Sequence, residues 1–312
     1  MSYVAAVDLG GTKILGGVFE VPREAGAIPD AVGRLAMREA VARRKEDTRP
    51  EEGPERVIER MAALVESLAE EAGVGPAGLS AVGVASPGPL DPDTGVVVHA
   101  PNLGWRHVPL AGRLEARLGV PVRVDHDCAL AALAEWSVRR ARGRAPDPLV
   151  YVTVGTGIGA GIIIGGRVFH GHRGAAGEVG HLTVLASGPR CRCGNRGCLE
   201  ALASGAALAR DADGGRPDAA RASRAARWVG LGLASVAAVL DPEVIVIGGG
   251  VALGLGSSFL ETVKHELRSR LMPAAWGGAV PAVEPPVLGE DSGLVGAALA
   301  AYGAAGVGRG RG

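Results

Sequence analysis

The residues with the most evident chemistry lie between Gly174 and Glu200, in the stretch GAAGEVGHLTVLASGPRCRCGNRGCLE. Cys191, Cys193 and Cys198 fall within eight residues, and His181 lies ten positions before the first of them. Three thiolates and one imidazole form a closed tetrahedral ligand set for structural zinc. Free buried thiols and a disulfide are the alternatives. A disulfide would leave one of the three cysteines unpaired, and no export signal indicates an oxidising compartment.

A zinc ion in this loop would affect the polar residues around it, namely Glu178, His181 and Glu200. A glycine-rich loop does not hold a carboxylate still, whereas a metal makes the loop rigid enough to bind a small hydroxylated ligand. One ring nitrogen of His181 would bind zinc and the other would donate to a ligand hydroxyl. The alternative is that His181 is a structural ligand only.

Two glycine-rich turns occur in similar surroundings. Asp8-Leu9-Gly10-Gly11-Thr12-Lys13 separates two apolar segments, and so does the run from Gly155 to Gly161, which begins Gly155-Thr156-Gly157. Paired glycines let backbone N–H groups approach an anion, and Asp8 could hold a metal ion or its water shell nearby. An ordinary hairpin turn is the alternative for the first segment. A strand is expected after each turn, which excludes the P-loop and the dinucleotide-binding motif. We therefore predict a duplicated architecture that holds one polyphosphate from both sides.

A third group of polar residues, Asp125-His126-Asp127, follows an expected strand at Val120–Val124 and precedes a helical pattern. Ligands bind at the carboxyl ends of strands in open α/β sheets, so Asp127 could be a base directed at a ligand. The alternative is that Asp127 only caps the helix. Gly248-Gly249-Gly250 follows the strand expected at Val244–Ile247, ahead of a helix at Ser257–Leu271, and suits the ribose and base of a nucleotide.

The elements that must position these residues follow from length and pattern. A chain of 312 residues suits two domains. We expect a strand at Val32–Val41, a solvated charged segment at Arg43–Glu55, a helix at Val57–Ala72 and a last helix at Gly293–Tyr302. Residues 306–312 are expected to form a disordered tail.

Composition argues against several kinds of partner. Acidic and basic residues balance at 33 each, and aromatic residues make up 3%, so neither a basic stripe nor a base-stacking platform for nucleic acid is expected. The chain has no apolar run long enough for a membrane span and no leader-like N-terminus, so we expect a cytoplasmic protein with no membrane partner.

Together these motifs resemble those of the ROK family, which comprises sugar kinases and sugar-responsive repressors with the actin-like ATPase fold. The resemblance covers nearly the whole chain, and bacterial ATP-dependent glucokinases show the most similar motifs. The motifs occur in family order: DLGGTK at 8–13, SPGPLD at 86–91, APNLGW at 100–105, GTGIGAGII at 155–163, GEVGH at 177–181, CRCGNRGCLE at 191–200 and PEVIVIGGGV at 242–251.

The resemblance implies an α/β protein with the two-domain actin-like ATPase (ribonuclease H-like) fold and a central ligand cleft. The small domain would span residues 1–125, with a C-terminal helix at 292–305 packing back on it. The large domain would span 126–291 and carry the zinc loop. Repressors of the family carry a DNA-binding segment ahead of this fold, and the first strand here is expected by residue 4, so we expect an enzyme. The family also leads us to expect a homo-oligomer, a dimer or a tetramer.

The resemblance also implies the reaction, which is phosphoryl transfer from Mg²⁺-ATP to a hexose such as D-glucose, with Asp127 as general base. The phosphates would lie near Asp8, Gly10, Gly11, Thr12, Lys13, Gly155, Thr156 and Gly157, and the adenosine near Gly249 and Gly250. The hexose would contact Gly88, Asn102, His126, Asp127, Glu178, His181 and Glu200. Zinc would be held by His181, Cys191, Cys193 and Cys198.

Two positions depart from the family pattern: His126 and Ala129 stand where relatives usually have Asn. These changes leave other acceptors open, namely N-acetylmannosamine, N-acetylglucosamine, mannose and fructose. A sugar-binding regulatory protein and the use of polyphosphate as donor are further alternatives.

Overall fold

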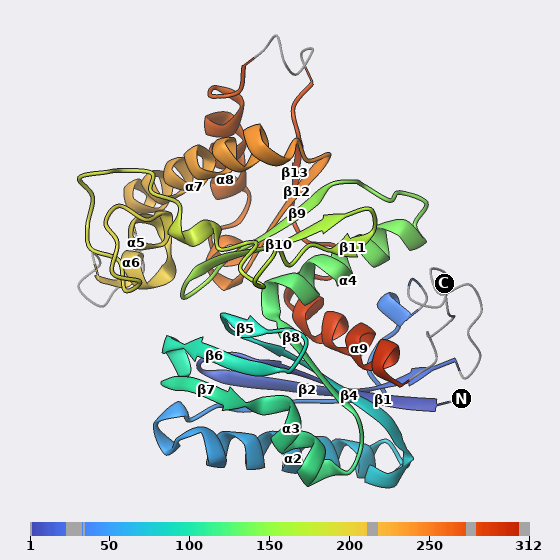
Figure 1. Ribbon diagram of the computed structural model, residues 1–312. Helices are drawn as coiled ribbons and strands as arrows, with labels where there is room; N and C mark the ends of the chain where they lie inside the picture. The colour runs from blue at the N-terminus through green and yellow to red at the C-terminus, as the bar shows by residue number, and fades with distance from the viewer. Residues whose placement is uncertain (1, 23–32, 34, 211–217, 273–278, 306–312) are drawn as a thin grey trace. The chain divides into compact units, whose positions relative to one another are not determined.

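The computed structural model describes residues 2–22, 33, 35–210, 218–272 and 279–305, and the tail expected at 306–312 lies outside them. The chain divides into two compact units (Figure 1). Unit 1 consists of Met1–Ala145, His170–Ala175 and Asp291–Gly312, and unit 2 of Pro146–Phe169 and Ala176–Glu290. The chain therefore passes from one unit to the other four times.

Unit 1 is built on a five-stranded sheet with the order β3-β2-β1-β4-β8. The first three strands pair antiparallel, whereas β4 and β8 run parallel to β1. The central strands are almost entirely apolar because both faces of the sheet are covered. The strand bounds are β1 Ser2–Leu9, β2 Lys13–Val21, β3 Ala42–Asp47, β4 Leu79–Ser86 and β8 Val122–His126. A small antiparallel sheet is formed by β5 Leu90–Asp91, β6 Val96–Ala100 and β7 Trp105–Pro109.

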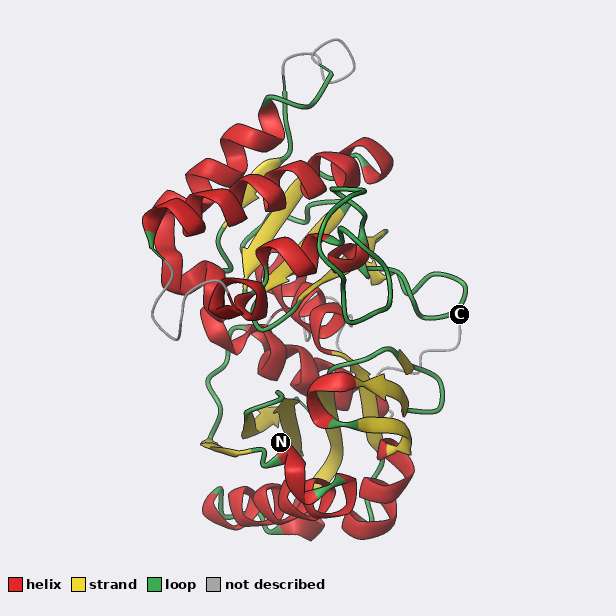
Figure 2. Ribbon diagram, turned by 90° about the vertical axis from the view of Figure 1, so that its left-hand side faces the viewer, coloured by secondary structure: helices red, strands yellow, loops and turns green. Residues whose placement is uncertain are grey.

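Helices cover both faces of this sheet (Figures 1 and 2). Helix α2 (Pro54–Glu71) and helix α3 (Leu110–Leu118) lie on one face, and α4 (Asp127–Ala141) and α9 (Ser292–Ala304) are on the other side. Apolar residues at helical spacing in α2, among them Met61, Leu64 and Leu68, are fully buried against β1 and β2. The helix expected from this pattern is confirmed.

Helix α9 lies close against both the sheet and α4. A Cβ atom on Gly83 of β4 would overlap the carbonyl oxygen of Ala297, and one on Gly296 would overlap that of Leu130. Ser292 donates a hydrogen bond of 3.0 Å to the buried carboxylate of Glu135, which also pairs with Arg139. These contacts group α4 with unit 1, whereas the boundary expected from the sequence precedes this helix.

Unit 2 is built on a second five-stranded sheet, with the order β11-β10-β9-β12-β13. The strands are β9 Leu149–Val154, β10 Ile158–Ile164, β11 Arg167–Val168, β12 Val244–Gly248 and β13 Ala282–Glu284. Helices α7 (Ala219–Leu240) and α8 (Gly250–Arg268) pack against each other and α8 packs on the sheet, while α5 (Leu199–Ala203) and α6 (Gly205–Arg210) pack on α7.

The two sheets have the same topology. In each, an antiparallel hairpin is extended by a third antiparallel strand on one side and by two parallel strands on the other. The hairpin β1–β2 of unit 1 corresponds to β9–β10 of unit 2, and each hairpin turn carries one of the glycine-rich motifs. The strand–turn–strand arrangement and the duplication predicted from the sequence are both confirmed.

Two sequence-based assignments were wrong. Leu35 and Ala36, which were expected in a strand at Val32–Val41, are helical. The strand is β3 (Ala42–Asp47), which lies at the edge of the sheet. Residues 43–47 are all charged and alternate between more and less exposed, so the sequence resembles a solvated segment. The helix expected at Ser257–Leu271 is present as the second part of α8, which begins at Gly250, has a non-helical residue at Gly256 and ends at Arg268.

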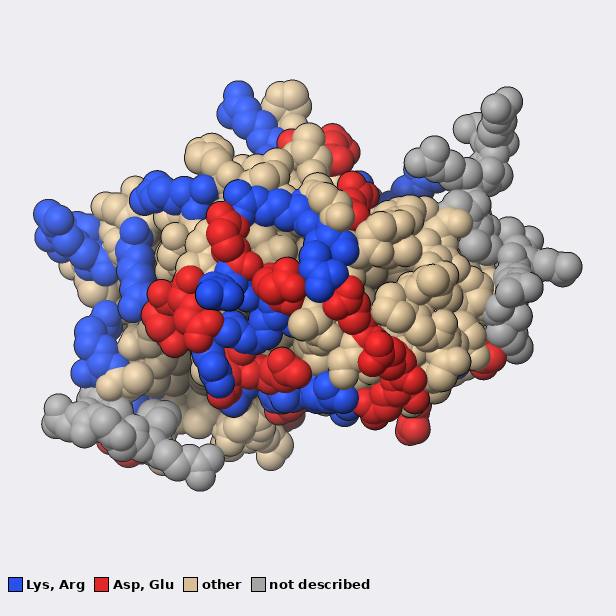
Figure 3. All heavy atoms as spheres, turned by 90° about the horizontal axis from the view of Figure 1, so that it is seen from below, with Lys and Arg blue, Asp and Glu red and all other residues tan. Residues whose placement is uncertain are grey.

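The face formed by α2 and α3 carries both charges interleaved, as Figure 3 shows. Arg117 of α3 contacts Glu59 at 3.0 Å and Glu66 at 2.6 Å, and Arg113 pairs with Glu55. No field of a single sign therefore builds up on this face. None of the helices in the described part of the chain is both long and apolar enough to span a membrane.

Candidate active site

The turn between β1 and β2 is fixed by a hydrogen bond within it and by two from Thr48, the residue that follows β3. The N–H of Gly10 donates to the carbonyl of Lys13 at 2.9 Å. Thr48, which is fully buried after β3, donates its N–H to the carbonyl of Thr12 at 2.9 Å and its hydroxyl to that of Gly10 at 2.7 Å. No sequence motif pointed to Thr48, because this contact joins residues that are 38 positions apart.

Two side chains at this turn belong to the predicted site. Lys13 pairs with Asp47, and both side chains are about half exposed. A Cβ atom on Gly11 would lie 3.1 Å from the Cβ of Asn102, so the turn predicted for phosphates and the Asn predicted for the hexose are neighbours in unit 1.

Asp8 is the last polar residue of β1 before the turn. Desolvation, and then the charge of Asp127, raise the pKa of Asp8 to about 7. The carboxylate is therefore unfavourable in its ionised form unless a cation balances it. Asp127 is near enough to Asp8 for its charge to be the second cause of this shift.

Asp127 is the first residue of α4, and His126 is the N-cap, so Asp127 does not occupy the capping position proposed as its alternative role. Oδ1 of Asp127 accepts the N–H of Cys128 at 2.6 Å and lies 3.2 Å from Nδ1 of His126. A Cβ atom on Gly88 would lie 2.8 Å from Cδ2 of His126. His126 is thus packed between Gly88 and Asp127, and the Asp127 side chain is 36% exposed.

The corresponding turn of unit 2 is also held by a neighbouring element. Gly155 donates its N–H to the carbonyl of Gly157 at 2.9 Å. At the start of α6, the N–H of Gly205 donates to the carbonyl of Gly155, and the N–H of Ala206 donates to the carbonyl of Thr156. Gly249, with φ of 90°, is the N-cap of α8, and a Cβ atom there would lie 2.6 Å from the carbonyl oxygen of Val154. Gly249 and Gly250 therefore lie at the end of β9, just before the turn that follows it.

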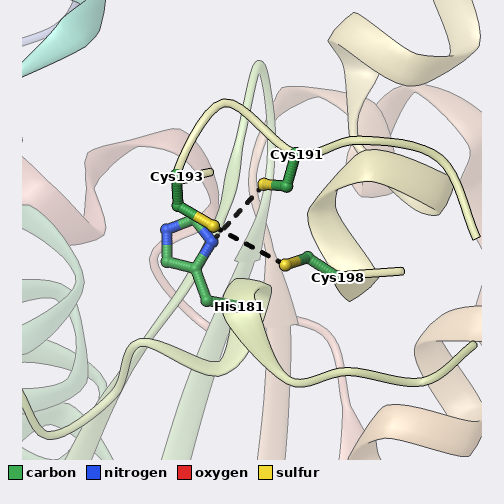
Figure 4. A group of neighbouring side chains, drawn as sticks. All are labelled: His181, Cys191, Cys193 and Cys198. Atoms are coloured by element: carbon green, nitrogen blue, oxygen red, sulfur yellow. Dashed lines mark hydrogen bonds between the residues drawn. The ribbon is translucent and has the colours of Figure 1, made fainter. Parts of the chain in front are cut away.

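The four predicted zinc ligands point at one another (Figure 4). Their ligand atoms all lie within 4.8 Å of each other. Sγ of Cys191 is 3.7 Å from Nδ1 of His181, and Sγ of Cys193 is 3.7 Å from Sγ of Cys198. Zinc bonds of about 2.0–2.3 Å at tetrahedral angles place ligand atoms roughly 3.5–3.8 Å apart, so these separations fit a tetrahedral ion. The cysteines are not joined by disulfides.

The two ring nitrogens of His181 face different groups. Nδ1 faces the thiols, whereas Nε2 lies 3.7 Å from Oε2 of Glu178. Burial raises the pKa of Cys191, and it raises that of Cys198 to about 12, so these thiols stay protonated without a cation. A metal ion would displace these protons, as thiolate coordination requires.

The predicted residues separate into two sets. Unit 1 holds Asp8, Gly10, Gly11, Thr12, Lys13, Gly88, Asn102, His126 and Asp127, and unit 2 holds Gly155, Thr156, Gly157, Glu178, His181, Glu200, Gly249, Gly250 and the three cysteines. Each set lies near the glycine-rich turn of its own unit. In unit 2, Glu200 connects the metal cluster to that turn.

Two sheets of identical topology, each with a glycine-rich hairpin turn, define the actin-like ATPase fold, and solved structures of that fold match this chain over nearly its whole length. The chain belongs to the ROK family, whose sequence profile matches residues 4–303.

Three similar proteins illustrate the relationship. The glucokinase of Halalkalibacterium halodurans is 36% identical over 252 residues, which is 70% of this chain and 74% of that protein. The structure of a ROK hexokinase from Thermus thermophilus has a TM-score of 0.76 at 40% identity and covers 96% of this chain and 98% of its own. A ROK family glucokinase from Streptomyces griseus, solved with glucose and AMPPNP, has a TM-score of 0.77 at 31% identity, covering 97% and 100%.

Proposed function

We propose that this protein transfers the terminal phosphoryl group of ATP to a hexose, with D-glucose as the acceptor and glucose 6-phosphate as the product. The observation that carries the proposal is the proximity of Asp127 to Asp8 within unit 1. A base for the sugar hydroxyl must lie beside the phosphates for direct transfer, and Asp8 begins the turn proposed for those phosphates. The glucose and AMPPNP complex of a relative supports the same pair of substrates.

Each proposed residue has one task in this reaction. Asp127 accepts the proton of the attacking hydroxyl, a contribution of roughly 10²–10⁴ in rate. Gly11 and Thr12, together with Thr156 and Gly157 of the other unit, present backbone donors to the phosphates, and Gly10 and Gly155 border the phosphates while their own N–H groups close the turns. Lys13 supplies positive charge, and Gly249 and Gly250 border the adenosine. Asn102, Glu178, Glu200 and His126 hold the sugar hydroxyls, with Gly88 against the sugar.

Two metal ions complete the proposal. Mg²⁺ would balance the phosphate charge, and Asp8 would hold it or its water shell, in keeping with a carboxylate that needs a cation to ionise. Zinc would be structural, held by His181, Cys191, Cys193 and Cys198, because four protein ligands leave no open position for chemistry. It would fix His181 with Nε2 directed at Glu178 and the sugar.

A coupled assay over a panel of sugars and two donors tests the function. Glucose, mannose, fructose, N-acetylmannosamine and N-acetylglucosamine are each supplied with ATP and then with polyphosphate. We expect the highest kcat/KM for glucose with ATP. A higher value for an N-acylhexosamine would reassign the acceptor. Tight glucose binding by calorimetry without turnover of any sugar would favour a regulatory protein, and light scattering on the same sample tests the expected homo-oligomer.

A further inference from the structure

A histidine outside the predicted site is hydrogen-bonded to a buried carboxylate beside the proposed base. Nε2 of His170 lies 3.1 Å from Oδ1 and 3.0 Å from Oδ2 of Asp125. The Asp125 side chain is 7% exposed and that of His170 is 30% exposed. A carboxylate with so little access to water depends on a partner, because an unpaired buried charge is strongly destabilising.

Asp125 fixes the backbone just before Asp127. Its Oδ1 accepts the N–H of the next residue, His126, at 2.7 Å. His126 in turn contacts Asp127 through Nδ1. His170, Asp125, His126 and Asp127 therefore form one connected set at the end of β8 and the start of α4, and His170 is its outermost member.

His170 belongs to a short segment with an unusual course. Residues His170–Ala175 are part of unit 1, although the chain on both sides of them, Phe169 and Ala176, belongs to unit 2. Gly174, with φ of 72°, fixes the segment on unit 1, since a Cβ atom there would lie 3.2 Å from the carbonyl oxygen of Leu90. Glu178 follows only three residues after the segment ends. The pair His170–Asp125 thus attaches this segment to β8, the strand that directly precedes Asp127.

We propose that His170 is a positioning residue for the phosphoryl transfer described above, which holds Asp125 and thereby the backbone orientation of His126 and Asp127. This inference rests on the proposed function. His170 touches neither substrate nor the transferred group in this scheme, and it acts only through Asp125. Removing it leaves the buried carboxylate of Asp125 without this hydrogen-bond partner, so the strand end rearranges and the base loses its alignment. Misplacement of a catalytic group by about 1 Å costs up to about 10²-fold in rate.

The charges around His170 set the sign of its pH dependence. The hydrogen bond to Asp125 raises the pKa of His170, desolvation opposes it, and the charges of Asp125 and Asp93 raise it while that of Arg123 lowers it. Because the pKa is raised, the pair contributes fully to the stability of the folded state at low pH, and this contribution is lost as pH rises through the folded-state pKa of His170. The wild-type kcat should therefore have an alkaline decline that depends on His170.

The test compares His170→Gln and His170→Ala with His172→Gln as the matched control. His172 is exposed, lies two residues away in the same segment, and has no part in the proposed machinery. We expect His170→Ala to lower kcat about tenfold with an unchanged KM for ATP, measured well below the Tm of each variant. His170→Gln keeps one N–H donor, so it should lose less activity at pH 7 and lack the alkaline decline of the wild type.

A second measurement does not depend on activity. Hydrogen–deuterium exchange of the peptide covering residues 122–130 should be faster in His170→Ala than in the wild type, because the His126 N–H loses its fixed acceptor. Unchanged exchange in this peptide, or a normal kcat in His170→Ala, would overturn the proposal. A wild-type protein that phosphorylates no hexose would contradict the proposed function instead, and the exchange result would still decide whether His170 orders the strand end.

Discussion

Glu200 joins the zinc loop to the glycine-rich turn of unit 2, because its Oε2 accepts the backbone N–H of Ile158 at 3.0 Å. Glu200 stands at the start of α5, two residues after Cys198, and Ile158 is the first residue of β10. A residue proposed for the hexose is therefore attached both to the metal cluster and to the turn proposed for the phosphates.

Gly157 is the tightest point of this junction, since a Cβ atom there would lie 2.6 Å from Oε2 of Glu200. Gly157→Ala should displace the carboxylate and raise the KM for glucose about tenfold or more, because a hydrogen bond to a charged group contributes about 1.5–3 kcal/mol. Steady-state kinetics with both substrates check this. Gly112→Ala is the control, as it adds a methyl group in open space on α3. Equal glucose KM values in the two variants would contradict the prediction.

Replacement of the proposed base separates binding from chemistry. Asp127→Asn keeps the shape of the side chain and removes its ability to accept a proton. The kcat should fall by about 10² or more, while glucose binding measured by calorimetry survives. A variant with nearly normal kcat would show that another group is the base.

His126 can contact the sugar or support Asp127. The pH dependence of the glucose KM and of kcat distinguishes these two roles. Protonation of an imidazole removes its acceptor, whereas Asn keeps a donor and an acceptor at every pH. If His126 contacts the sugar, the glucose KM of the wild type should rise as pH falls from 8.5 to 5.5, and His126→Asn should flatten this dependence. Because Nδ1 lies 3.2 Å from Asp127, we expect a change in kcat as well. Identical profiles of both constants would exclude both roles.

Asp8 should reduce stability at neutral and alkaline pH. Its pKa is about 7 in the folded protein and 3.8 in the reference state, so the folded state holds more protons between these values. Stability therefore falls as pH rises through this window, and the loss is complete above it. Asp8→Asn should raise the Tm at pH 8 more than at pH 5, while lowering kinase activity. A Tm difference that is the same at both pH values would refute the assignment.

Zinc content tests the metal cluster directly. The purified protein should contain one zinc ion per chain by elemental analysis, and Cys193→Ser should lose the metal together with affinity for glucose, because Glu178 and Glu200 lie on either side of the cluster in the chain. Arg192→Ala, an exposed change in the same loop, should retain both. Metal-free protein with full activity would refute a structural zinc.

The sequence predicted the elements whose pattern is local. The two hairpin turns, helix α2 and the Cys/His cluster all follow from residues close together in the chain. Strand β3 did not, because its charged residues form an edge strand only through pairing with β2. Thr48 and His170 were missed for the same reason. Each is an ordinary polar residue whose partner, Gly10 or Asp125, lies tens of residues away, and only folding brings the pair together.

The division of unit 1 into three chain segments has a consequence for biosynthesis. Its sheet comes from residues 2–126, but α9, which packs on β1, β4 and β8, is translated only after the whole of unit 2. Until then the apolar surface around Gly83 lacks α9. The sheet of unit 1 therefore stays incomplete while unit 2 is translated. Nascent chains therefore expose this apolar surface throughout the translation of unit 2, and termination before Ser292 would leave unit 1, whose sheet is made first, without α9.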